Sequence, residues 1–282
     1  MVVGDVNSTL AGVLAAVKLH IPVAHVEAGL RSYDRTMPEE INRLLTDAIS
    51  DYLFTPSPDA NENLRKEGIA QQKIFLVGDV MVDSLLFNKD RAAKRQIISQ
   101  LGLKNESYAL LTVHRPSNVD EKESLLRIIN ALGGISKRIP IVFPAHPRTQ
   151  KPIVQFGFSR FFEDRRILLI EPLGYLDFLN LEMNAKLVLT DSGGIQEETT
   201  VLNIPCLTLR NTTERPITIT QGTNTLVWND TEKIITEAFK IVDGNAKKGS
   251  CPELWDGKAA ERIVAVLASG EYNTGKGRIN ND

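Results

Sequence analysis

The sequence is poor in cysteine and in aromatic residues, and it has no excess of charge of one sign. Its two cysteines, Cys206 and Cys251, cannot build a disulfide framework and show no metal-ligand spacing. The 33 basic and 35 acidic residues give a net charge of −2, so no global positive field would gather nucleic acid. The longest apolar region, residues 10–26, is interrupted by lysine, histidine and proline, which argues against a membrane span. Because the N-terminus also lacks a secretion signal, we expect a cytoplasmic protein in a reducing compartment.

Short apolar runs alternate with amphipathic stretches along the 282 residues, enough chain for two domains or one large one. The expected strands span residues 23–26, 51–55, 74–77, 108–113, 141–144, 167–170, 186–190 and 205–209. The expected helices span residues 8–20, 38–50, 59–67, 121–132, 175–184, 194–202, 231–242 and 257–269, with a helical connector at 79–101. This alternation predicts an α/β protein with two parallel sheets, each covered on both faces. Two such sheets would enclose a cleft, with ligands at the carboxyl ends of the strands.

The first residues, Met1 to Asp5, read as the end of a buried strand that runs directly into a turn. A strand this short keeps its place only between neighbours in a sheet. We therefore expect that one or more βα units would precede it in a complete domain.

The clearest motif is Thr-Asp-Ser-Gly-Gly at residues 190–194, where a strand ends and a helix begins at once. Its glycines would let backbone N–H groups and the Ser192 hydroxyl approach a phosphate at the helix N-terminus. Glu198, one turn later, could accept hydrogen bonds from ribose hydroxyls. The alternative is an ordinary strand-to-helix turn with Ser192 as a cap. In the loop that follows, Arg215 could neutralise a diphosphate or could be a solvated surface charge.

A second group of candidates consists of carboxylates at three consecutive strand-to-helix junctions near the N-terminus. These are Asp5, Glu27 and Glu39, which we expect at one rim of the cleft. Crowded, partly desolvated carboxylates have pKa values that are pushed apart, which suits proton transfer. For the neighbouring Glu40 we prefer a simple interaction with the helix dipole.

Three further side chains are weaker candidates. His114 follows the first strand of the second half and could assist a phosphate leaving group, although a lone histidine is more often structural. His146 occupies a similar strand end, whereas His20 reads as a surface residue. Phe178 could be a platform for a base, but its helical periodicity favours the core.

Taken together, five motifs in order resemble the non-hydrolysing UDP-N-acetylglucosamine 2-epimerases of bacteria and archaea. The matching motifs are Gly-Asp-Val-Asn-Ser-Thr at 4–9, His-Val-Glu-Ala-Gly-Leu-Arg at 25–31, Pro-Glu-Glu-Ile-Asn-Arg at 38–43, Thr-Asp-Ser-Gly-Gly-Ile-Gln-Glu-Glu at 190–198 and Thr-Thr-Glu-Arg-Pro at 212–216. The resemblance covers residues 1 to about 268.

The resemblance implies a GT-B-like fold of two Rossmann-like, doubly wound domains with an interdomain cleft, the first of them truncated. Residues 1–95 would be the rest of the N-terminal domain with its connector. Residues 96–270 would form the nucleotide-binding domain, whose last helix could pack back on the first domain, and residues 271–282 a loose tail. The implied reaction inverts C2 of a UDP-sugar: a base removes the C2 proton, UDP is eliminated to leave 2-acetamidoglucal, and UDP adds back.

The resemblance also implies roles for individual residues. Asp5, Glu27 and Glu39 would be the acid and base carboxylates, and His114 would aid the departure of UDP. Its implied UDP-binding residues are Ser192, Gly193, Gly194, Glu198, Arg215 and Phe178. Arg115 and His146 would be candidates for contact with a second, activating UDP-sugar. A homodimer is implied, and no metal or redox cofactor.

Two departures from the family pattern affect the function expected of this chain. His-Arg-Pro-Ser-Asn at 114–118 stands where the family often has His-Arg-Arg-Glu-Asn, which points to a related UDP-diacetamido sugar or its uronate as an alternative substrate. Because the family's first strand and basic loop are absent, we expect these 282 residues to be poorly active or prone to aggregation. Three other functions remain open: a GT-B glycosyltransferase, an inactive nucleotide-sugar sensor and a hydrolysing epimerase.

Overall fold

The computed structural model describes residues 1–105, 107–163 and 166–269, which fall into two compact units. Unit 1 comprises Met1–Ser84 together with the chain from Glu253 onward, and unit 2 comprises Leu85–Pro252. The division lies within helix α4 (Val80–Ala93), eleven residues before the boundary that the sequence suggested at 95/96. The predicted loose tail lies outside the described residues.

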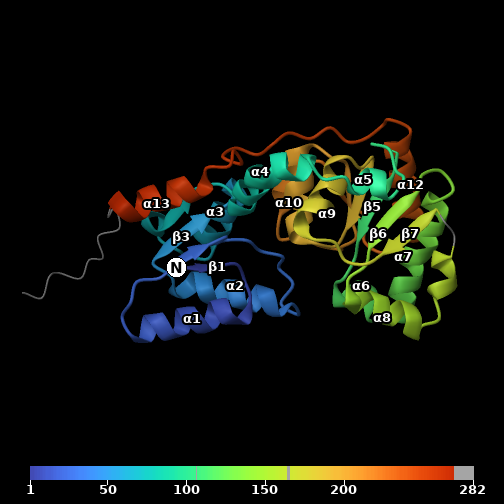
Figure 1. The fold of residues 1–282 in the computed structure, drawn as a ribbon. Coiled ribbons are helices and arrows are strands. Elements are labelled where there is room, and N and C mark those ends of the chain that lie inside the picture. Colours follow the sequence, from blue (N-terminus) through green and yellow to red (C-terminus); the bar gives the residue numbers. More distant parts are fainter. Residues whose placement is uncertain (106, 164–165, 270–282) are drawn as a thin grey trace, which may run out of the picture. The chain divides into compact units, whose positions relative to one another are not determined.

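Unit 1 is built on a parallel sheet of four strands in sequential order, β1-β2-β3-β4 (Figure 1). The strands are β1 (Val2–Val3), β2 (Ala24–Val26), β3 (Tyr52–Thr55) and β4 (Ile74–Leu76). Its helices are α1 (Asn7–Lys18), α2 (Pro38–Ile49), α3 (Pro58–Lys66), the single 3-10 turn η1 (Gln71–Lys73), the start of α4, and α13 (Ala259–Ser269). Helix α13 belongs to this unit because Ile263 and Val266 pack against the apolar cluster around Phe54.

Unit 2 contains a parallel sheet of six strands in the order β10-β9-β8-β5-β6-β7. The strands are β5 (Ala109–Thr112), β6 (Ile141–Pro144), β7 (Ile167–Ile170), β8 (Leu187–Thr190), β9 (Cys206–Thr208) and β10 (Asn224–Leu226). The remaining helices are α5 (Ile97–Gln100), α6 (Pro116–Val119), α7 (Lys122–Ile135), α8 (Pro147–Gln155), η2 (Ser159–Phe162), α9 (Tyr175–Met183), α10 (Gly193–Leu202), α11 (Pro216–Thr220) and α12 (Thr231–Val242).

The sheet of unit 2 is covered on both faces, as its sequence requires. Along β5, Ala109 and Leu111 face one core, which α7 and α12 complete, while Leu110 faces a second core, which α5 and α9 complete. This alternation follows from the two-residue period of a strand, and the continuous apolar run is typical of a strand buried on both sides. The predicted class, α/β with two parallel sheets, is confirmed.

The element boundaries differ from the expected ones at several points. The connector expected over 79–101 is divided, because α4 ends at Ala93 and α5 begins at Ile97. Helix α1 begins at Asn7 after Val6, so neither Asn7 nor Ser8 is its cap. Six short elements were not predicted: α6, α8, α11, β10 and the 3-10 turns η1 and η2.

Candidate functional site

The strand order of unit 2 places two polar loops side by side. Read from the other edge, the strand order is β7-β6-β5-β8-β9-β10. The chain first adds β6 and β7 on one side of β5, and it then returns to add β8, β9 and β10 on the other side. In open parallel sheets, ligands bind at this switch point, beyond the carboxyl ends of the two central strands. Here those ends lead into His114-Arg115 and into Asp191-Ser192.

A buried carboxylate, Asp191, ties these two loops together. Its side-chain oxygens accept hydrogen bonds from the backbone N–H groups of His114 (3.0 Å) and Arg115 (2.8 Å) and from the Asn118 amide (3.0 Å). The His114 Nδ1 atom lies 3.2 Å from the same carboxylate. The imidazole is 44% exposed and its ring centre is 6.4 Å from that of His146. Asp191 therefore orients His114 while leaving part of its ring open to solvent.

The first turn of α10 brings a helix N-terminus and a guanidinium together. Ser192 is the N-cap position, yet among the described residues its side chain makes no capping hydrogen bond. A Cβ atom added to Gly193 would lie 2.5 Å from Arg215 Nη1 and 2.9 Å from Glu214 Oε1, so a larger residue would push these side-chain ends away from the turn. With Gly194 next in the helix, the backbone N–H groups of this turn and Arg215 form one electropositive corner.

Arg215 is itself held by carboxylates. Its guanidinium donates to Glu197 and to Glu214, and Arg210 Nη2 lies 2.6 Å from the other Glu214 oxygen. Burial raises the pKa of Glu214, but the charges of Arg215, Arg210 and Arg115 outweigh that effect and hold it well below its ordinary value. The arginine is therefore a fixed part of the corner, only 11% exposed, and not a solvated surface charge.

Glu198 is almost fully buried and lies beside a second acid. Its Oε1 accepts a hydrogen bond from the Tyr175 hydroxyl (2.7 Å). Glu182, on the neighbouring helix α9, is fully buried, and its pKa is raised well above the ordinary value by burial and then by the charge of Glu198. Phe178, on the same helix, is partly buried against the apolar cluster of β5 and β8. The sequence expectation of a core position for Phe178 agrees with this packing.

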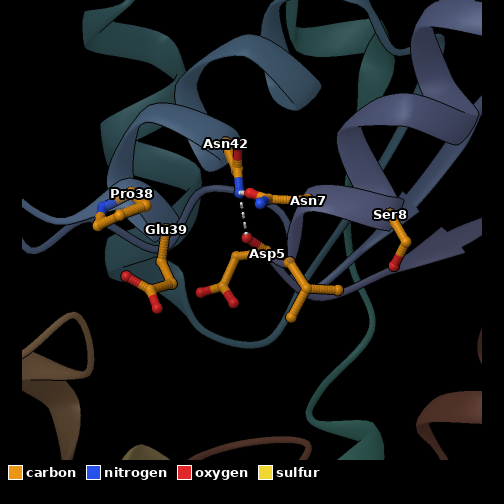
Figure 2. A pocket seen from close by; sticks show the side chains of 7 residues that line it. Asp5, Asn7, Ser8, Pro38, Glu39 and Asn42 are labelled. Carbon is orange, nitrogen blue, oxygen red and sulfur yellow. Dashed lines mark hydrogen bonds between the residues drawn. The ribbon is translucent and has the colours of Figure 1, made fainter.

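Unit 1 carries a pocket of about 510 Å³ at the carboxyl ends of its strands. Its lining residues come from the β1–α1 turn and from the start of α2: Asp5, Val6, Asn7, Ser8, Pro38, Glu39 and Asn42. Figure 2 shows the Asp5 and Glu39 carboxylates pointing to the same side, and Asn42 donating to the Asp5 carbonyl (2.9 Å). The structure thus brings two of the three candidate carboxylates together; Glu27 is not among the residues that line this pocket.

The inner face of α2 is polar. Every residue that this helix buries is polar or charged: Glu40, Asn42, Arg43, Thr46 and Asp47. Arg43 Nη1 donates to Asp5 Oδ2 (2.6 Å) and Nη2 donates to Glu40 (2.5 Å), so one guanidinium joins the two carboxylates. Arg43 is 2% exposed and held on two sides, so this short charge-assisted bond restrains the orientation of the partly exposed Asp5 carboxylate.

Glu40 has a larger role than the sequence suggested. It is 1% exposed and accepts hydrogen bonds from the backbone N–H groups of Ser32 and Tyr33 (both 2.9 Å) as well as from Arg43. Burial raises the pKa of Glu40, but the Ser32 and Arg43 hydrogen bonds outweigh it and lower the pKa below its ordinary value. The interpretation of Glu40 as a residue that only complements the helix dipole is therefore wrong: it anchors the loop before α2.

The loop that carries Glu27 is anchored from α2 as well. Glu27 has a φ of 70°, a left-handed conformation that costs a non-glycine residue about 1 kcal/mol, so the loop needs support. That support comes from Asp47, whose side chain contacts the His25 ring, the Gly29 N–H (3.0 Å) and the Arg31 guanidinium (2.7 Å). Sequence reasoning missed Asp47, because a mid-helix aspartate resembles a solvated residue.

Further observations bear on metals and membranes. Over residues 1–105, 107–163 and 166–269, no group of three or more histidine, cysteine or acidic side chains could hold a metal ion. In the same described residues, no helix is both long and apolar enough to cross a membrane. Cys206 is buried, Cys251 is exposed, and no disulfide joins them.

Comparison with known proteins decides the family. The family model described as UDP-N-acetylglucosamine 2-epimerase matches residues 1–268. The chain belongs to this family. A UDP-N-acetylglucosamine 2-epimerase of Methanocaldococcus jannaschii is 48% identical over 278 residues, which cover 96% of this chain and 75% of the relative. The crystal structure of an M. jannaschii UDP-GlcNAc 2-epimerase in complex with UDP-GlcNAc and UDP superposes with a TM-score of 0.86, covering 95% of this chain and 75% of that one.

Members of the 2-epimerase family are isomerases, and the predicted family and GT-B-like fold class are confirmed by these matches. One further relative bears on the substrate. The UDP-2,3-diacetamido-2,3-dideoxy-D-glucuronate 2-epimerase of Pseudomonas aeruginosa is 43% identical over 272 residues, covering 95% of this chain and 74% of the relative. High identity is thus found to 2-epimerases that are named for different UDP-sugars.

Proposed function

We propose that this chain interconverts UDP-N-acetylglucosamine and UDP-N-acetylmannosamine by inverting C2. Two sets of observations support the proposal: the family match over residues 1–268, and a carboxylate pocket in unit 1 with an electropositive corner in unit 2. The observation that carries it is the pairing of Gly193 with Arg215, because a helix N-terminus reinforced by a buried arginine suits a diphosphate.

In the proposed mechanism, unit 2 holds UDP. Ser192, Gly193, Gly194 and Arg215 would bind the diphosphate, Glu198 the ribose hydroxyls, and Phe178 would lie near the uracil. Glu198 is 3% exposed and accepts from Tyr175. A ribose hydroxyl would therefore have to share or replace that hydrogen bond.

The chemical step would use the carboxylates of unit 1. One of Asp5, Glu27 and Glu39 removes the C2 proton. The C1=C2 double bond forms as the C1–O bond breaks, and the electron pair of the C1–O bond leaves with UDP. Another carboxylic acid then returns a proton to the opposite face of C2, and the UDP oxygen re-forms the bond to C1. His114 would assist UDP departure through Nε2, since its Nδ1 faces Asp191.

The test is exchange of the C2 hydrogen with deuterated solvent, followed by NMR with UDP-N-acetylglucosamine as the sole substrate. Deuterium accumulates over time, so even slow turnover is measurable. Exchange with formation of UDP-N-acetylmannosamine is the expected result. Tight UDP binding without exchange would support a nucleotide-sugar sensor, dependence on an added acceptor a glycosyltransferase, and release of free sugar a hydrolase; each of these would contradict the proposal.

A second candidate substrate is a UDP-diacetamido sugar or its uronate. The P. aeruginosa relative and the sequence His-Arg-Pro-Ser-Asn at 114–118 favour it. Faster C2 exchange with UDP-2,3-diacetamido-2,3-dideoxy-glucuronate than with UDP-N-acetylglucosamine would decide for it.

Three sequence expectations stay predictions. They are the homodimer, the cytoplasmic location and the contact of Arg115 and His146 with an activating UDP-sugar. Strictly hyperbolic kinetics would contradict the last of these.

A further inference from the structure

The imidazole of His25, at the centre of strand β2, is buried between two hydrogen-bond acceptors. Its Nδ1 lies 2.6 Å from Asp47 Oδ1 and its Nε2 lies 3.0 Å from the Gly4 carbonyl oxygen. A carbonyl can only accept, so Nε2 carries a proton. Asp47 also accepts from Gly29 N–H and pairs with Arg31, as expected of an ionised carboxylate, so Nδ1 carries a proton as well. A doubly protonated, cationic ring, with each nitrogen donating to one of these acceptors, satisfies this geometry.

One bond of this ring reaches the turn that carries Asp5, and the other reaches Asp47 of α2, which in turn holds the loop that carries Glu27. Gly4 precedes Asp5, and its φ of +71° places the turn in the left-handed region. Glu27 follows the ring by two residues and is left-handed too. Strands β1 and β2 are paired with Val3 opposite Val26, so the turns after them are neighbours. His25 and Asp47 together thus connect the β1 turn, the Glu27 loop and helix α2.

We propose that the His25–Asp47 ion pair is a positioning element that sets Asp5 and Glu27 in register for proton transfer at C2. This inference rests on the proposed function. Neither side chain touches the pocket: both are fully buried, with exposed fractions of 0%. They act through the Gly4 carbonyl and the 25–31 loop. Their effect should therefore fall on the rate of the chemical step, with little effect on UDP binding in unit 2.

The charges around His25 make this role dependent on pH. Asp47 faces the ring from α2 and Glu27 from its own loop, Arg31 reaches it only through Asp47, and the adjacent strand positions are the aliphatic Val2 and Leu53. Burial lowers the pKa of His25, but the hydrogen bond and charge of Asp47 outweigh it and raise the pKa above its ordinary value. As the pH rises through this raised pKa, one of the two bonds is lost, so the exchange rate should fall.

The experiment measures C2 deuterium exchange from UDP-N-acetylglucosamine against pH for the 282-residue chain and its variants. His25→Gln keeps one donating group, the amide NH₂, which cannot replace both ring nitrogens. We expect exchange to slow by about 100-fold, as for a misplaced catalytic group, while the Kd of UDP changes less than twofold. His25→Gln should also lose the alkaline fall in rate. The matched control is His20→Asn on the exposed turn after α1, where asparagine tolerates the φ of 57°.

The variant Asp47→Asn distinguishes a positioning role of the ion pair from a role in stability alone. It removes the charge that raises the pKa of His25, so the alkaline fall should move to lower pH, a change that a purely structural role would not produce. An unmoved pH profile in Asp47→Asn, or His25→Gln exchange within threefold of the parent, would overturn the inference. If His25→Gln fails to fold by circular dichroism, the parent and Asp47→Asn profiles decide.

Failure of the proposed function gives a different result. The parent chain would then show no exchange at any pH, while ¹⁵N NMR of the His25 ring would still report on the pair. Two protonated ring nitrogens at pH 7 are expected, and a neutral ring would overturn the inference without reference to activity.

Discussion

The two units hold their buried charges in different ways. In unit 1 the buried acids of α2 are matched with cations: Glu40 with Arg43, and Asp47 with His25 and Arg31. In unit 2, Glu214 is matched with arginines, but Glu182 lies beside another acid, Glu198. The apolar cores differ as well, because the six-stranded sheet of unit 2 has large clusters on both faces, whereas the clusters of unit 1 are small.

The difference shows two uses of buried charge. Breaking a matched buried pair leaves an uncompensated ion, which costs about 3–5 kcal/mol, so the pairs of unit 1 hold its loops firmly where apolar packing is thin. In unit 2, burial and the neighbouring Glu198 raise the pKa of Glu182, which favours its neutral form. Four substitutions and one control variant test this comparison.

Glu40→Gln should have the largest effect on stability. It removes the buried charge that holds the 32–33 loop and one of the two carboxylates that pair with Arg43, and we expect a loss of about 3 kcal/mol at pH 7 in urea unfolding. Because the pKa of Glu40 is lowered in the folded state, its contribution is present above the unfolded-state pKa and is lost as the pH falls through the folded one. The penalty of Glu40→Gln should therefore shrink in acid.

Its neighbour supplies the matched comparison. Glu39 lies one position earlier on α2, is exposed and lines the pocket. Glu39→Gln should change stability by less than about 0.5 kcal/mol while slowing C2 exchange by about 100-fold or more. Equal stability losses in the two variants would contradict the distinction between anchor and candidate catalyst.

Gly193→Ala should weaken UDP binding by about tenfold, or 1.4 kcal/mol. The added methyl group would lie 2.5 Å from Arg215 Nη1 and would displace the guanidinium from the helix N-terminus. Isothermal titration with UDP measures the effect. Gly133→Ala in α7 is the control, since nothing lies within 4 Å of its added carbon; it should leave UDP binding unchanged and stabilise the chain slightly. Unchanged affinity in Gly193→Ala would count against a diphosphate at this corner.

Glu182→Gln should have the smallest effect, and in the opposite direction. The folded-state pKa of Glu182 is raised by burial and by Glu198, so its carboxyl destabilises the fold increasingly as the pH rises above the unfolded-state pKa. The neutral amide removes this penalty, and we expect a gain of about 1 kcal/mol at pH 8 and none near pH 4. Thermal unfolding at the two pH values measures it; a loss of stability at pH 8 would show that Glu182 is ionised and paired.

The apolar strands of unit 2 could be predicted from sequence, and β6, β7 and α12 begin and end at the residues expected. Their apolar runs are buried on both faces, so hydrophobicity alone marks them. Strand β10 was not predicted. Its Asn224 side chain is held by hydrogen bonds to Gln196 and Thr200 of α10, and such a tertiary contact leaves no local signal in the sequence. Helix α8 was not predicted, because the prolines in its sequence suggest a loop.

The candidate site could be predicted only in part. The motifs located Asp5, Glu39, Ser192 and Arg215, because unusual residue types stand at strand ends. They did not indicate that Glu40 would be buried and Glu39 exposed, since both are glutamates in the first turn of a helix. That distinction depends on the Ser32 and Tyr33 N–H groups, which only the folded loop brings to Glu40.

Helix α2 exposes Leu45 and turns Arg43 inward, the reverse of an ordinary amphipathic helix. Neutralising Arg43 would leave both Asp5 and Glu40 without this counter-charge, whereas neutralising either acid leaves Arg43 with only one of its two carboxylates. Single substitutions at these positions would then rarely be tolerated. We expect these three positions to covary across homologous enzymes, changing in concert or remaining fixed.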